Sequence, residues 1–187
     1  GKVNTSFNEG AVAIRGDGGY LVFAGCDRPE GKGSCDLYGA VWTSKGWSEA
    51  FSLGDSLNTP QWETQPTLSS DGRLLLFVRA PERDKNQSTL FYSTLRDDGT
   101  WTRAKPLPGK VNTPYNDICP RLHADGNTLY FSSDGHLGMG GLDLFVSRRS
   151  LDGTWGEPTN LGYPINSTQD DFGLAVSPDG KTGYMGR

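Results

Sequence analysis

Short apolar runs alternate with polar turn sequences along the whole chain, and no segment keeps a helical period over ten or more residues. The pattern is clearest between residues 109 and 162, where it predicts strands at 118–123, 128–133, 142–149 and 155–161. An Asp125-Gly126 pair separates the first two strands, and glycine there supplies the positive φ of a tight turn. The sequence "SLDGTW" marks a second turn before the last strand. The pattern therefore predicts a unit of four antiparallel strands.

This unit recurs along the chain with a step of 54 residues. Four kinds of marker keep the step: Asn-Thr or Asn-Ser pairs, acids, Asp-Gly pairs and tryptophans. The Asn-Thr or Asn-Ser pairs begin at Asn4, Asn58, Asn112 and Asn166, and the acids are Glu9, Glu63, Asp117 and Asp171. The Asp-Gly pairs begin at Asp17, Asp71, Asp125 and Asp179, and the tryptophans are Trp47, Trp101 and Trp155. Four independent markers in one register establish an internal repeat.

Repeated four-stranded antiparallel units of this length predict an all-β fold, a β-propeller. We expect blades at approximately 1–54, 55–108, 109–162 and 163–187, the last one incomplete. Three full blades and half of a fourth predict part of a larger propeller, because a closed propeller usually has four to eight blades. A four-bladed ring left open, or one completed by another chain, is the alternative. The repeated tryptophans are expected to pack between blades.

Composition fits this fold and narrows the function. The chain is 34% hydrophobic and has 26 glycines and 11 prolines, which favours many short strands joined by turns. No window holds 18 apolar residues, so this segment is not expected to insert into a membrane. A net charge of −4 without a basic cluster argues against nucleic-acid binding. The chain begins at Gly1 rather than Met, which we interpret as a mature segment.

Three cysteines are present. Cys26 and Cys35 enclose the loop "CDRPEGKGSC", and a disulfide between them would join two neighbouring strands and suit an oxidising compartment. The alternative is two free thiols at strand ends. Cys119 is expected to be a lone buried thiol. No cysteine–histidine cluster has zinc spacing and no calcium loop is present, so no metal or cofactor is predicted.

The repeated acids Glu9, Glu63, Asp117 and Asp171 are the first candidates for a binding site. They are expected just before the first strand of each blade, which is usually innermost, so they could form a carboxylate ring at the mouth of the channel. Such a ring could bind a cation, a basic peptide or a substrate amine. A structural role is the alternative: the acids, or the asparagines beside them, would accept backbone N–H bonds and fix the blade connections. Repetition in every blade favours the structural role.

Residues outside the repeat are the second candidates. Strand parity places the loops 25–35, 79–88 and 133–141 on the same face as the acids. Variable loops on a rigid scaffold are where recognition usually resides. These loops carry Arg28, Lys32, Arg79, Arg83, Lys85 and His136. An ordinary solvated surface is the alternative interpretation.

No catalytic motif supports an enzyme. The turn "SLDGTW" resembles the Asp-box of sialidases, but it lacks the residue between Asp and Gly, and no spacing supports an arginine triad. Glycoside hydrolysis needs two carboxylates flanking one bond, and the repeated acids offer candidates only by symmetry. Gly-x-Ser-x-Gly is absent, and neither His123 nor His136 has a suitable context for nucleophilic catalysis. A non-catalytic protein is therefore predicted.

The sequences "NTPYND", "ADGNTLYFSSDGHLGMGGLDLFVSRR" and "GTWGEPTNLGYPINS" resemble the TolB-type, WD-like propeller repeats of Bacteroidetes envelope proteins, in particular OmpA-type and PorE-like proteins. The second unit departs from this pattern, because "RAPERDKNQSTLFYS" lacks the Gly-rich loop and the Asp before the aromatic strand. The matching positions are Asn112, Thr113, Asn116, Asp117, Asp125, Gly126, Leu129, Tyr130, Phe131, Gly140, Gly141, Asp143, Phe145, Trp155, Asn160, Leu161 and Gly162.

The resemblance implies a periplasmic, outer-membrane-associated scaffold whose partners are other envelope proteins or peptide segments. It also implies a possible link to type IX secretion, and to peptidoglycan only through a domain outside this chain. A glycan-binding or glycan-hydrolysing, sialidase-like propeller is the alternative function.

Overall fold

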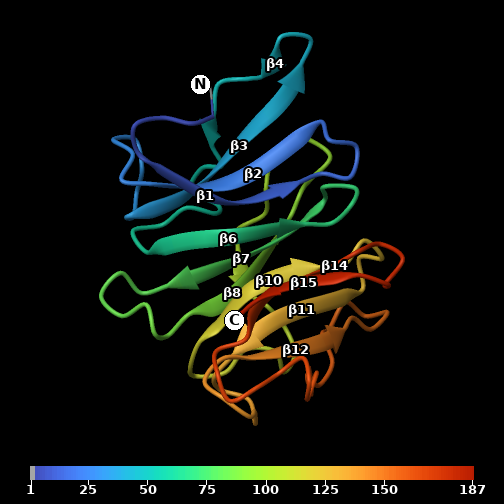
Figure 1. Cartoon of the computed structure of the whole chain (residues 1–187). Coiled ribbons are helices and arrows are strands. Elements are labelled where there is room, and N and C mark those ends of the chain that lie inside the picture. Colours follow the sequence, from blue (N-terminus) through green and yellow to red (C-terminus); the bar gives the residue numbers. More distant parts are fainter. Residues whose placement is uncertain (1–2) are drawn as a thin grey trace. The chain divides into compact units, whose positions relative to one another are not determined.

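The computed structural model describes residues 3–187, and across this range it contains strands and turns but no helix (Figure 1). The chain forms two compact units. One runs up to Lys85 and includes Phe91–Lys105, and the other comprises Asn86–Leu90 and Pro106–Arg187. Across the described residues no helix could span a membrane.

The first sheet has the strand order β1 (Asn8–Ile14), β2 (Tyr20–Cys26), β3 (Cys35–Thr43) and β4 (Gly46–Trp47), with β5 (Phe51–Ser52) also paired to β3. The second sheet has the order β6 (Trp62–Leu68), β7 (Leu74–Ala80), β8 (Thr89–Thr94) and β9 (Lys105–Pro106). Each strand follows its neighbour in sequence, as in the predicted blade.

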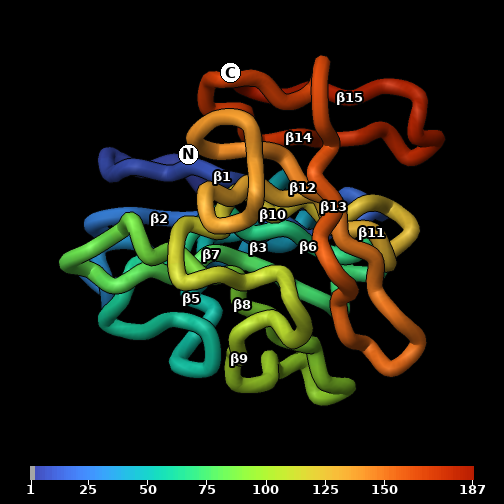
Figure 2. The backbone as a smooth tube through the Cα atoms, turned by 90° about the horizontal axis from the view of Figure 1, so that it is seen from below, coloured from blue at the N-terminus to red at the C-terminus, as the bar shows by residue number. Residues whose placement is uncertain are grey.

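The third sheet repeats the order with β10 (Asp117–Leu122), β11 (Thr128–Ser133), β12 (Asp143–Arg148) and β13 (Thr159–Asn160). A two-stranded sheet of β14 (Phe172–Val176) and β15 (Gly183–Gly186) follows, and Figure 2 shows these two strands side by side. The all-β fold built from antiparallel four-stranded blades is therefore confirmed.

The fourth strand differs from the prediction. A continuous strand at 155–161 was expected, but Trp155 forms only isolated bridges, to Arg149 and to Gly109, and regular pairing returns at β13. The first two sheets break in the same place, after Trp47 and after Trp101. Pro158 lies inside the break of the third sheet and has no N–H to donate. The breaks at 48–50 and 102–104 contain no proline, so proline is not their common cause.

The first strand of every sheet carries a β-bulge at the same repeat position. The bulged residues have left-handed backbones with φ of 45° at Ala11, 51° at Gln65, 52° at Cys119 and 68° at Gly173. The pairing register shifts around each of them. Only one of the four is glycine, the residue that adopts this conformation without strain. The bulge bends the strand two residues beyond each repeated acid.

A buried apolar cluster joins the first two sheets. Ala13, Val22 and Leu37 of the first sheet belong to the same cluster as Leu75 and Phe77 of β7. Trp101 completes it and is 7% exposed. The predicted packing of a repeated tryptophan between sheets therefore holds for Trp101, which is buried although its own backbone pairing is a single bridge.

Candidate functional site

The repeated acids lie at the beginning of the first strands rather than before all of them. Glu9 and Glu63 are second residues of β1 and β6, Asp117 is the first residue of β10, and Asp171 directly precedes β14. Each acid lies two residues before the bulge of its strand. Glu63, Asp117 and Asp171 are fully buried. The expectation that they all precede the strand was therefore wrong.

Each acid is held by the hydroxyl residue four positions before it. The backbone N–H and the side-chain hydroxyl of that Thr or Ser both donate to the carboxylate, as Thr59 does to Glu63 with N···O of 3.0 Å and O···O of 2.5 Å. The same pair of bonds links Thr5 to Glu9, Thr113 to Asp117 and Ser167 to Asp171. The Asn-Thr marker and the acid marker therefore form one hydrogen-bonded turn.

A guanidinium neutralises three of the four acids. Arg28 lies 2.8 Å from Glu9, Arg79 lies 2.7 Å from Glu63, and Arg187 lies 2.6 Å from Asp171. Each guanidinium also donates to a backbone carbonyl that precedes the Asn-Thr or Asn-Ser pair. The acceptors are Val3, Leu57 and Ile165. The arginine thus ties the loop before the first strand to the acid inside it.

The arginines do not occupy one repeat position. Arg79 and Arg187 are equivalent, but Gly25 stands at that position in the first sheet and Arg28 follows three residues later. A Cβ at Gly25 would lie 2.7 Å from Nε of Arg28, so glycine there makes room for the displaced guanidinium. Sequence reasoning missed this exchange, although arginine at both 79 and 187 was a visible signal.

The third sheet has a serine and a histidine in place of the arginine. Ser133, at the position of Arg79, donates to Asp117 at 2.7 Å, and His136, at the position of Arg28, places Nε2 2.8 Å from the Val111 carbonyl. Burial raises the pKa of Asp117, and the bonds from Thr113 and Ser133 offset this only in part. In the first sheet burial also opposes ionisation of Glu9, but the bonds from Thr5 and Arg28 outweigh it and lower the pKa.

Aromatic rings flank Arg28, Arg79 and His136 in the three full sheets. The Arg28 guanidinium lies 5.3 Å from the Phe23 ring and 4.4 Å from the Tyr38 ring, as expected for cation–π contacts. Arg79 contacts Phe77 and Phe91 in the same way, and His136 lies near Phe131 and Phe145. These partners hold Arg28, Arg79 and His136 inside the fold.

The repeated asparagines fix the connections between sheets. The Asn58 side chain accepts from the Leu37 N–H at 2.8 Å and donates to the Leu37 carbonyl at 2.9 Å. Asn112 bonds Leu90, and Asn166 bonds Leu144, in the same two-bond arrangement. The asparagine side chain therefore forms, with the third strand of each full sheet, the two backbone hydrogen bonds that a neighbouring strand would form.

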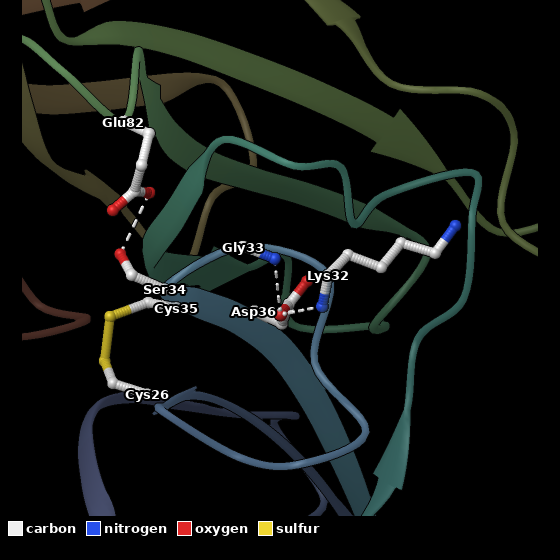
Figure 3. The surroundings of a disulfide bond; sticks show 7 residues. All are labelled: Cys26, Lys32, Gly33, Ser34, Cys35, Asp36 and Glu82. Atoms are coloured by element: carbon white, nitrogen blue, oxygen red, sulfur yellow. Dashed lines mark hydrogen bonds between the residues drawn. A yellow bond between two sulfur atoms is a disulfide. The ribbon is translucent and has the colours of Figure 1, made fainter.

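The loops carry the remaining candidates. Cys26 and Cys35 form a disulfide, and Figure 3 shows the loop they close, in which the N–H groups of Lys32 and Gly33 donate to Asp36. Ser34 of this loop donates to Glu82 of the 79–88 loop at 3.0 Å (Figure 3).

In the 79–88 loop Arg83 is exposed to solvent, and the Lys85 ammonium lies 5.0 Å from the Trp62 ring. Cys119 forms no disulfide and is half-buried rather than fully buried. Among residues 3–187 no three His, Cys, Asp or Glu side chains are grouped to hold a metal ion.

No family model and no curated protein matches the chain. Solved structures do match, and the three described next have low sequence identity to this chain. TolB from Acinetobacter baumannii aligns with a TM-score of 0.67 at 14% identity over 98% of this chain and 39% of its own. Putative TolB from Agrobacterium tumefaciens aligns with 0.54 at 20% identity over 97% and 58%. The Pseudomonas aeruginosa periplasmic gluconolactonase PpgL aligns with 0.57 at 16% identity over 93% and 49%.

These structures define the fold class: the chain is folded like the TolB-type β-propellers. It spans about two fifths to three fifths of the length of these three structures. At this level of identity the likeness establishes the fold alone.

Proposed function

We propose that this chain is a non-catalytic scaffold that binds another protein or a peptide segment outside the cytosol, through the loops 25–35, 79–88 and 133–141. The engagement of the repeated acids is the observation that carries the proposal. A catalytic acid or base must be free to exchange a proton with substrate. Glu9, Glu63 and Asp171 are instead bound to a hydroxyl, a backbone N–H and a guanidinium. In this proposal the repeated acids stabilise the fold, and the loops bind the partner.

The disulfide supports a place outside the reducing cytosol, where such bonds persist. The TolB-like fold is compatible with a periplasmic protein. Association with the outer membrane, with type IX secretion or, through a further domain, with peptidoglycan is the finer part of the proposal. It rests on the resemblance of the repeats to Bacteroidetes envelope proteins.

Capture from a bacterial envelope extract, in a strain carrying this gene, tests the loops. Arg83 is exposed in the 79–88 loop, whereas Lys45 lies in the turn between β3 and β4 at the opposite end of the first sheet. Arg83→Glu should reduce cross-linking to the partner, and Lys45→Glu, an equal change of charge, should not. Equal cross-linking by both variants would remove these loops from the interface.

A glycan-binding or glycan-hydrolysing propeller is the second candidate, because PpgL and an arabinofuranosidase from Lactobacillus brevis share the fold. Its test is turnover of sialosides, arabinosides and sugar lactones by the wild-type protein. We expect no turnover. Turnover that is lost in folded Glu63→Gln or Asp117→Asn protein would replace the scaffold by an enzyme.

A further inference from the structure

The loop closed by Cys26 and Cys35 and the adjoining part of β3 contain three buried polar atoms that have no hydrogen-bond partner among residues 3–187. They are Nε of Arg28 in the loop, and Oδ1 of Asp36 and the hydroxyl of Tyr38 on β3. The residues are 9%, 2% and 1% exposed. Buried polar atoms in proteins are nearly always paired with protein or with ordered water, so three of them in one region require an explanation.

The three groups belong to one cluster. The Arg28 guanidinium stacks 4.4 Å from the Tyr38 ring, and Asp36 and Tyr38 are two residues apart on β3, so they point to the same face of the sheet. Burial, followed by the negative charges of Glu30 and Asp36, raises the pKa of Tyr38 to about 12.

Only one of the two carboxylate oxygens of Asp36 accepts hydrogen bonds from the described residues. Oδ2 accepts from the N–H groups of Lys32 and Gly33 at 2.7 and 3.2 Å (Figure 3), and this leaves Oδ1 as the unpaired atom. The third sheet has the same loop arrangement, in which Oδ2 of Asp143 accepts from Met139 and Gly140. Oδ1 of Asp143 also has no partner among the described residues.

The tyrosine hydroxyl distinguishes the first sheet from the other two. Phe91 contacts Arg79, and Phe145 contacts His136, in the way that Tyr38 contacts Arg28. The repeat therefore needs an aromatic ring at this position but not a hydroxyl. A buried hydroxyl that the fold does not need, placed beside two other unpaired groups, points to a bound molecule.

We propose that the disulfide-closed loop holds one buried water molecule between Arg28, Asp36 and Tyr38. The Arg28 Nε–H and the Tyr38 O–H donate to the water oxygen, and the water donates one proton to Oδ1 of Asp36. Three hydrogen bonds are typical of a buried water, and a single water satisfies all three groups at once. It orients Arg28, which in turn pairs with Glu9. This inference does not depend on the proposed function.

The test combines a high-resolution crystal structure of the wild-type protein with melting of Tyr38→Phe. An ordered water within hydrogen-bond distance of all three atoms is expected. Tyr38→Phe removes one water ligand and leaves the ring contact intact, so we expect its Tm to fall by about 2–4 °C. Tyr115→Phe, at a residue that is 60% exposed, is the matched control and should leave Tm unchanged.

Two results would overturn the proposal. One is a well-ordered loop without a water peak between the three groups. The other is a rise in the Tm of Tyr38→Phe, because deleting a hydroxyl that has no partner at all stabilises the folded state.

Discussion

The same acid position has opposite electrostatics in different sheets. Glu9 has Arg28 beside it, and its pKa is lowered because hydrogen bonds from Thr5 and Arg28 outweigh its burial. Asp117 receives only neutral donors from Thr113 and Ser133, so burial dominates and its pKa is raised. A guanidinium at this position does not by itself lower the pKa of the acid. Arg79 pairs with Glu63, but Glu63 is fully buried and burial raises its pKa.

This contrast predicts opposite pH dependences for two matched variants. Because the pKa of Asp117 is raised in the folded state, its contribution to stability is fully present below its ordinary pKa and is lost as pH rises through the folded value. Asp117→Asn should therefore gain stability relative to wild type between acidic and neutral pH, with a slope of at most about 1.4 kcal/mol per pH unit.

Glu9→Gln is the matched variant, and the sign reverses. The pKa of Glu9 is lowered, so its contribution is present above the ordinary pKa and is lost as pH falls through the folded value. Glu9→Gln should be less stable than wild type at neutral pH, and the difference in stability should shrink as the pH falls. Urea unfolding of both variants across this pH range is the measurement, and slopes of the same sign would contradict the assignment.

Backbone strain at the bulge gives a second prediction at the residue scale. Ala11 has φ of 45°, where a residue with a Cβ is strained, and it is only partly buried. Ala11→Gly should raise the free energy of unfolding by about 1 kcal/mol. The reverse change at the equivalent position of the last sheet, Gly173→Ala, should lower it by a similar amount. Urea unfolding measures both, and a loss of stability in Ala11→Gly would show that the bulge is not strained.

At the scale of the element, the loop after the second strand is closed differently in each sheet. The first sheet uses the Cys26–Cys35 disulfide. The third sheet has Asp134 at the position of Cys26, and its carboxylate accepts from the backbone N–H and the side-chain amide of Asn116. A covalent bond in one sheet and hydrogen bonds in another thus hold the same loop near the acid.

Loss of the disulfide should loosen this loop. A bridge across nine positions restricts the unfolded chain by about 2–3 kcal/mol in the chain-entropy model. The Cys26→Ser/Cys35→Ser double variant should lose roughly that much stability. Amide exchange should increase at Lys32 and Gly33, whose N–H groups donate to Asp36. Cys119→Ser is the control, since Cys119 forms no disulfide. If amide exchange were unchanged in the double variant, the loop would stay ordered without the disulfide.

The elements also show what the sequence could and could not predict. A fixed step of markers predicted the sheets, because Asp-Gly turns and apolar strands are local signals. The break after Trp155 was not predicted. Pairing of this segment depends on how close it lies to the third strand of the sheet, and local sequence preferences do not show that distance. The partner of Glu9 was missed for a similar reason: Arg28 lies three positions from its counterparts, and only the space above Gly25 shows that it takes their place.

At the scale of the whole molecule, the first two sheets share one apolar core. The cluster of Ala13, Val22, Leu37, Leu75 and Phe77 joins them, and Trp101 belongs to the same cluster. A sequence step alone predicted that tryptophans pack between blades. It could not show that Trp47, at the equivalent position of the first sheet, is only partly buried.

Trp101→Ala should therefore act on two sheets at once. Removal of a large buried aromatic side chain typically costs about 3–5 kcal/mol, because a cavity replaces its packing contacts. Trp47→Ala, the same change at the equivalent position, should cost clearly less, since Trp47 is partly exposed. Urea unfolding followed by fluorescence of the remaining tryptophans compares the two. If both variants lost the same stability, Trp101 would act within its own strand connection, and the coupling of the first two sheets would have to rest on the aliphatic residues of the cluster alone.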